Sequence, residues 1–137
     1  SFNLVEQKAR YELFKLVDDN DLGLIAKRPI ANGAWRANEN PNVHSAPTNY
    51  AEEYFRRAGI MTRLGNITDE PEDRIMTSMG YIFSFNDIDV GIIGTQNPKH
   101  LLSNIDMYSE CLKISREVIS ELNRRFDEFG KNWDQRT

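Results

Sequence analysis

Two short apolar segments, each followed by a polar loop and then a helix-forming segment, most strongly limit what this chain can fold into. The segments are "LGLIAK" at 22–27 and "DVGII" at 89–93. Near-continuous apolar character of this length is typical of strands buried on both faces of a parallel sheet. Because helical patterns separate the two segments, the sequence predicts an α/β architecture whose parallel strands are joined by right-handed crossovers.

Helical periodicity fills most of the remaining chain. Residues 2–5, "FNLV", predict the end of a strand, and the helix after them is expected to place its apolar residues on one face. A helix capped by Asn49 and running to about residue 61 carries acid–arginine pairs at a spacing of four residues, which predicts a solvated face. The residues concerned are Tyr11, Leu13, Phe14, Leu16 and Val17 in the first helix, and Glu52 with Arg56 and Glu53 with Arg57 in the second.

Three later helices are predicted from their start and stop residues. The first begins near Pro71. The second follows an Asn97 cap and opens at Pro98, with Leu101, Leu102 and Ile105 as its inner stripe. The last runs from about residue 115 to 129 and is ended by Gly130.

Composition narrows the class of protein. The 137 residues fit one domain, 1–137, and the net charge of −4 gives no reason to expect nucleic acid or a membrane surface as a partner. No apolar run is long enough to span a membrane. The single cysteine, Cys111, excludes an intramolecular disulfide framework and is interpreted as a packed thiol. A chain without disulfides favours a cytoplasmic location. The two histidines are too far apart in the sequence for a spaced metal motif.

The turns after the two apolar segments are the candidate binding loops. In α/β folds, ligands bind beyond the carboxyl ends of the strands, where backbone amides at helix N-termini attract anions. The turn with Thr95, Gln96 and Asn97 therefore predicts an anion cradle, to which Lys99 and His100 add positive charge. An ordinary, well-capped turn is the alternative. The segment 28–49, "RPIANGAWRANENPNVHSAPTN", predicts a long functional loop, with disorder as the competing interpretation.

Three segments in register resemble the aldo/keto reductase family. "FNLVEQKARYELFKLVDDNDLG", "LGLIAKRPIANGAW" and "VGIIGTQNPKHLLSNI" are similar to the stretches around strands six, seven and eight of these enzymes, and the similarity extends over almost the whole chain. The resemblance implies a partial (β/α)8 TIM barrel, from the last part of strand six through strand eight and the C-terminal helices. It also implies a role in the NADP(H)-dependent transfer of hydride to a carbonyl in the complete enzyme.

The resemblance further implies which residues bind the cofactor. Those at the pyrophosphate would be Arg28, Ile30, Asn32 and Gly33, and those at the adenosine 2′-phosphate and adenine would be Gly94, Thr95, Gln96, His100, Ser103 and Asn104. Many family members have lysine in place of Gly94 and arginine in place of His100, so preference for NADP(H) should be blunted and NAD(H) is an alternative cofactor. The family's Asp, Tyr, Lys and His proton-transfer tetrad lies on earlier strands. No catalytic residue is therefore expected in this chain, which would be inactive alone.

A different class of function remains open. The chain could be a stand-alone binding or interaction module that has lost catalysis. A barrel cut after strand six leaves open strand edges and an exposed apolar inner layer, which predicts self-association through the exposed edges.

Overall fold

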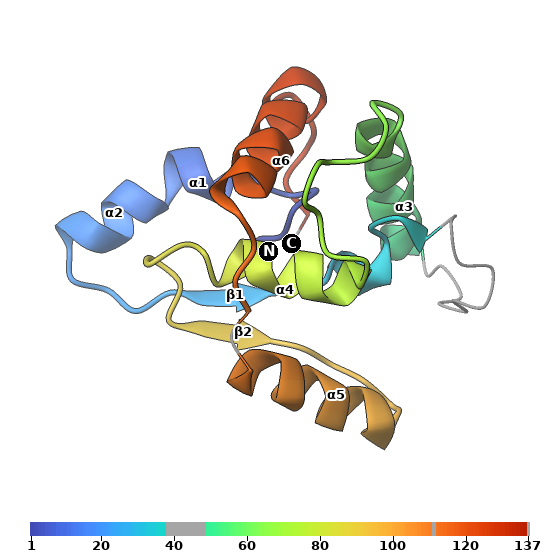
Figure 1. Cartoon of the computed structure of the whole chain (residues 1–137). Coiled ribbons are helices and arrows are strands. Elements are labelled where there is room, and N and C mark those ends of the chain that lie inside the picture. Colours follow the sequence, from blue (N-terminus) through green and yellow to red (C-terminus); the bar gives the residue numbers. More distant parts are fainter. Residues whose placement is uncertain (38–48, 111, 137) are drawn as a thin grey trace.

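The computed structural model of this chain describes residues 1–37, 49–110 and 112–136. Within these residues helices predominate, and two three-residue strands form one parallel pair (Figure 1). Residues 38–48 of the predicted binding loop, Cys111 and the predicted cap side chain of Asn49 lie outside the described part. The elements are, in chain order, α1 (Ala9–Glu12), α2 (Phe14–Asp19), β1 (Ile25–Lys27), η1 (Ala31–Gly33), α3 (Asn49–Thr62), α4 (Arg74–Ile82), β2 (Val90–Ile92), α5 (Pro98–Ser109) and α6 (Arg116–Phe129).

The predicted partial (β/α)8 barrel is wrong. A barrel strand pairs along both of its edges, whereas β1 and β2 pair only with each other in the described residues, apart from a single bond from the Phe2 amide to the Lys27 carbonyl at 3.3 Å. The apolar runs also form shorter strands than predicted. In the first run, the Leu24 amide donates to Oδ2 of Asp89 at 2.7 Å instead of extending a ladder. The architecture is a mostly helical body with one short parallel strand pair.

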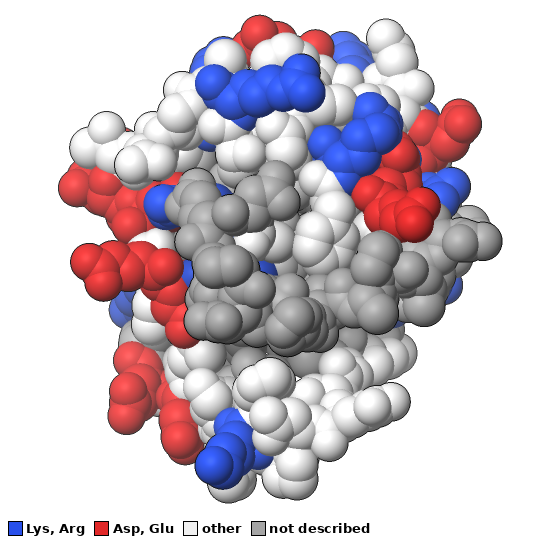
Figure 2. All heavy atoms as spheres, turned by 90° about the vertical axis from the view of Figure 1, so that its right-hand side faces the viewer, with Lys and Arg blue, Asp and Glu red and all other residues white. Residues whose placement is uncertain are grey.

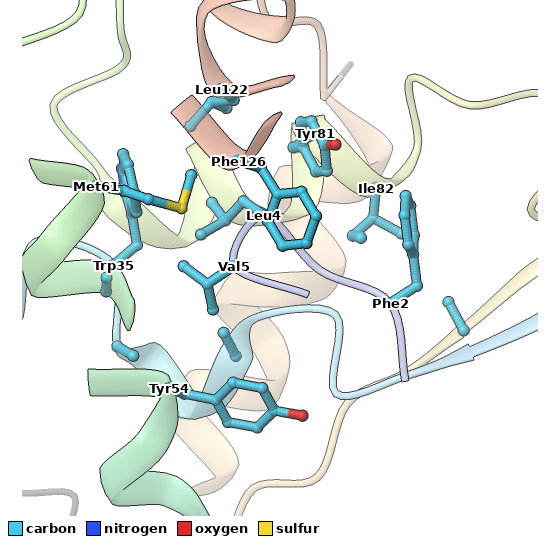
Figure 3. Close-up of a cluster of buried hydrophobic side chains, with 14 of the residues drawn as sticks. Phe2, Leu4, Val5, Trp35, Tyr54, Met61, Tyr81, Ile82, Leu122 and Phe126 are labelled. Carbon is cyan, nitrogen blue, oxygen red and sulfur yellow. The ribbon is translucent and has the colours of Figure 1, made fainter. Parts of the chain in front are cut away.

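The segment 2–7 is a buried turn and not the predicted strand. Oδ1 of Asn3 accepts the Val5 amide at 3.1 Å, and the backbones of Asn3 and Glu6 bond to each other across the turn. This asparagine-closed turn satisfies the Val5 amide and the backbone groups that Asn3 and Glu6 exchange, and Leu4 and Val5 lie fully buried in it. Figure 3 shows both side chains at the centre of the main core cluster.

That core is contributed by distant parts of the chain. Met61 of α3 and Leu122 and Phe126 of α6 are completely buried in it, and Trp35 is only 1% exposed (Figure 3). Beside these residues, four aromatic rings pack with centroid separations of 5.0–6.0 Å, mostly edge to face, which is the favoured geometry. The four are Phe2, Phe14, Tyr81 and Phe85.

Local signals for helix ends are confirmed where a side chain supplies a hydrogen bond. Asn97 Oδ1 accepts the Lys99 amide at 3.0 Å, and Pro98 opens α5 as predicted. Ser115 caps α6 through the Val118 amide at 3.2 Å. The start of α4 is displaced from Pro71 to Arg74, because Asp73 accepts the Ile75 amide at 2.7 Å and is the better cap.

Two predicted apolar helix faces are wrong. The first helix breaks at Leu13 into α1 and α2, and of its five apolar residues only Phe14 is fully buried, while Tyr11, Leu13 and Leu16 are exposed. On α5, none of Pro98–Ser109 is buried, and the predicted inner stripe of Leu101, Leu102 and Ile105 is exposed. In Figure 1, α5 lies beyond β2, away from the other helices. No helix in the described residues is long and apolar enough to cross a membrane.

Candidate functional site

The register of the strand pair places the two predicted binding loops together at the carboxyl end of the strands. Ile25 pairs with Val90, Ala26 with Gly91 and Lys27 with Ile92, in parallel. Since both strands run in the same direction, the loops that follow them begin side by side. The two loops singled out from the sequence therefore both begin at the carboxyl end of the strand pair. The predicted parallel orientation of the two strands is confirmed.

The first loop is a tight turn held from two sides. Arg28 has a positive φ of 60°, its carbonyl accepts Nδ2 of Asn3 at 3.0 Å, and its half-buried guanidinium reaches Oγ of Ser1 at 3.4 Å. Ile30 is half-buried, and its carbonyl accepts the Gly33 amide at 2.7 Å. The chain then turns through left-handed backbone at Asn32 and Gly33.

Gly33 is buried and its carbonyl is already bound. The guanidinium of Arg74, from α4, donates to it. Burial lowers the pKa of Arg74 from its ordinary value, and its neighbour Asp73 opposes the shift. A side chain in place of Gly33 would meet this guanidinium at about 3.4 Å. The Gly33 carbonyl therefore has a structural role, and ligand contact in this loop is left to its other groups.

The second loop is open to solvent. Gly94, Thr95 and Gln96 are all exposed, and nothing within 4 Å would oppose a side chain at Gly94. Oγ1 of Thr95 accepts the Asn97 amide at 3.2 Å, which shapes the turn into α5. Lys99, also exposed, stands in the first turn of this helix. The arrangement presents polar groups and a helix N-terminus to solvent, which is suited to an anion.

The three predicted residues further along α5 do not all lie near the carboxyl end of the strand pair. His100 is exposed in the first turn, and its amide bonds to the Asn97 carbonyl at 3.0 Å. Ser103 is exposed one turn later. Asn104 is half-buried and lines a groove between α4, β2 and α5. Of the second group, His100 thus lies closest to the loop, while Asn104 faces a different feature.

That groove has a volume of about 370 Å³ and mostly apolar walls. Phe83, which follows α4, packs edge to face on Tyr108 of α5 with centroids 5.0 Å apart. Gly91 of β2 lies beneath Phe83, where a methyl group would approach the ring to 2.9 Å. The sequence did not indicate this groove. The groove is lined by Met79, Phe83, Asp89, Val90, Gly91, Ile93, Leu101, Asn104, Ile105 and Tyr108.

A buried charge network was also missed. Arg57 was predicted on a solvated face, but its side chain is only 1% exposed and pairs with Glu6, which is fully buried. Burial raises the pKa of Glu6, and the Arg57 charge opposes this shift. Arg57 also donates to Glu53 at 2.8 Å and to the Asp134 carbonyl at 2.6 Å. This network joins three parts of the body and has a structural role.

Charged side chains are unevenly distributed over the surface. Figure 2 shows acidic and basic groups side by side in the upper part of one face, whereas the lower part carries acidic groups along its left side, a basic group at the bottom and uncharged residues at the lower right. In the described part of the chain, no three His, Cys, Asp or Glu side chains gather where they could hold a metal ion.

Comparison with known proteins adds no relative. No protein-family model matches this chain, and no curated protein matches it. The similarity to aldo/keto reductases therefore rests on the three sequence segments and stays a prediction.

Proposed function

We propose that this chain binds a nicotinamide dinucleotide, NADP(H) before NAD(H), as the C-terminal, cofactor-binding part of an aldo/keto reductase. One observation supports the proposal most directly. Lys27 pairs with Ile92 in parallel, so both predicted phosphate-binding loops begin at the carboxyl end of the strand pair. Two loops at one edge suit an elongated dinucleotide, because each can hold a different portion of it.

The chemistry of the two loops supports this assignment. Arg28 offers a guanidinium, the side chain that best matches phosphate oxygens. The exposed Thr95 and Gln96 offer hydrogen-bonding groups, and the N-terminus of α5 offers the positive end of a helix dipole. We assign the pyrophosphate to the loop of Arg28 and the adenosine end to the loop of Thr95 and the first turn of α5.

Binding without turnover is the expected behaviour of this chain alone. By the family resemblance, the groups that transfer protons to the carbonyl lie on segments that precede those matched here. Tyr54 of α3 is completely buried and thus unsuited to meet a substrate. We place the protein in the cytoplasm, because its one cysteine, Cys111, fits a reducing compartment.

Calorimetric titration with NADPH and NADH tests the proposal. We expect saturable binding of NADPH, weakened about tenfold or more by Arg28→Ala, since a hydrogen bond to a charged group contributes about 1.5–3 kcal/mol. Arg63→Ala removes an exposed arginine after α3 and is the matched control. Absence of NADPH binding by the folded chain, or equal effects of the two substitutions, would contradict the proposed site.

A second candidate is an interaction module without a cofactor. It is favoured by the exposure of apolar residues on β1, β2 and α5. A folded chain that binds neither dinucleotide but associates with itself would support this second candidate over the first.

A further inference from the structure

Exposed apolar side chains lie on the strand pair and on the neighbouring helix α5. Ile25 and Val90 are register partners, so their side chains project from the same face of the sheet, and Ile92 follows on that face two residues later. Val90 also lines the groove against α5, together with Leu101 and Ile105. We call Ile25, Val90, Ile92, Leu101, Ile105 and Tyr108 the apolar surface.

The six residues are about half exposed. Each is between 47% and 60% exposed. A fully exposed aliphatic side chain presents about 120 Å² of apolar area, so the six together present roughly 400 Å². The largest apolar patch on a typical monomer is about 300–600 Å² and often has a binding function.

The size of the apolar surface matches that of one side of a dimer interface. A standard interface buries about 800 Å² on each partner, of which somewhat more than half is apolar. Roughly 400 Å² of apolar area therefore corresponds to the apolar part of one such interface. Burying one side of a dimer needs no further apolar residues than those already exposed.

The charges around the strand pair are complementary to themselves. At the amino ends of the strands, Asp21 and Asp89 are exposed, and at the carboxyl ends Lys27 and Lys99 are exposed. A second copy packed with its strands antiparallel would bring each acidic end to a basic end. Such an arrangement is what a two-fold, isologous interface requires.

We propose that a second copy of this chain covers the apolar surface, with the strands of the two copies antiparallel. The contact is formed by side chains on the sheet face and α5, and not only by the strand edges. The proposal does not depend on dinucleotide binding, although Lys99 lies in the first turn of α5, to which the adenosine end was assigned.

Sedimentation velocity of the 137-residue chain over a range of concentrations tests this proposal. A dimer with a dissociation constant of about 10 μM or lower is expected for an interface of this size. Ile92→Glu should weaken the dimer at least about 30-fold, because a carboxylate would be buried without a partner. Leu16→Glu on α2 is the matched control, since Leu16 is 54% exposed and Ile92 is 55% exposed.

Two further variants separate the apolar and charged contributions. Leu101→Glu changes α5 and should act like Ile92→Glu, provided that circular dichroism shows a folded chain. Lys27→Glu should weaken the dimer by about tenfold at low salt, and less at high salt. A monomer at about 100 μM would overturn the proposal and leave the surface to a different partner. A dimer whose dissociation constant is unchanged by both Ile92→Glu and Leu101→Glu would also overturn it. A dissociation constant unchanged by Lys27→Glu would overturn the antiparallel arrangement.

Discussion

Nη1 of Arg57 donates to Oε2 of Glu6 at 2.5 Å, and both side chains are buried. The pair joins α3 to the N-terminal turn across 51 residues of sequence. Removal of one member leaves the other charge in a region from which water is excluded. We expect Glu6→Gln to lower the free energy of unfolding by about 3 kcal/mol, as measured by urea denaturation.

Arg56 provides the control for this substitution. It is the neighbour of Arg57 and also pairs with Glu53, at 2.6 Å, but its side chain is 51% exposed. Arg56→Gln should change the free energy of unfolding by less than about 1 kcal/mol. Equal losses for Glu6→Gln and Arg56→Gln would show that burial of the Glu6 pair has no energetic consequence.

Stability should fall in acid because two carboxylates have low pKa values when folded. Hydrogen bonds from Arg56 lower the pKa of Glu53 from 4.5 to about 2, and hydrogen bonds from Arg124 lower that of Glu121 equally, to about 2. The unfolded chain therefore binds more protons than the folded chain between these values. The stabilisation is present above pH 4.5 and is lost as the pH falls toward 2.

Urea unfolding at a series of pH values measures this loss. The double variant Glu53→Gln/Glu121→Gln should be less stable than the parent at neutral pH and should lose less stability on acidification. An unchanged pH dependence in the double variant would contradict the assignment of the acid sensitivity to these two carboxylates.

Two helical glycines should respond oppositely to alanine. A methyl group at Gly80 of α4 would come within 2.6 Å of Cγ2 of Ile114, whereas nothing lies within 4 Å of one at Gly59 of α3. Gly59→Ala should stabilise by about 0.5–1 kcal/mol through helix propensity. Gly80→Ala should destabilise by about 1–3 kcal/mol through overpacking. Thermal unfolding of the two variants compares them directly, and stabilisation by Gly80→Ala would contradict the packing described for Ile114.

A change at His100 should alter cofactor choice if the proposed adenosine site is correct. His100→Arg adds a permanent cation in the exposed first turn of α5. NADPH should bind about 10–100-fold more tightly and NADH about as before, because only NADPH carries the 2′-phosphate. Ser120→Arg, on the exposed side of α6, adds the same charge elsewhere. A similar gain for both dinucleotides, or for both variants, would place the 2′-phosphate away from His100.

The elements predicted correctly are those determined by neighbouring residues. Asn97 and Pro98 define the start of α5, and Ser115 and Gly130 delimit α6, since a cap needs only the next turn of its own helix. The parallel relation of the two strands was likewise predicted, because the helical segments between them require a crossover.

The failures concern what each element packs against. Leu101 and Ile105 have the spacing of a buried stripe, but burial depends on a neighbouring surface that the pattern of α5 cannot specify. Arg57 has the sequence spacing of a surface ion pair with Glu53, but its side chain is buried against Glu6, which is distant in the sequence. For the candidate site, the sequence predicted the loops at the strand ends, whereas the groove beside Asn104 arises from three elements and has no local sequence signal.

The burial of residues 2–7 has a consequence for how the chain acquires its structure. All six residues are buried, and Nε2 of Gln7 donates to the carbonyl of Leu122 across 115 residues of sequence. Contacts of such high contact order form slowly, because a long loop must close first. A ribosome releases residues 2–7 more than 100 residues before their partners on α6. The buried turn at 2–7 must therefore wait, exposed or chaperoned, until α6 has emerged.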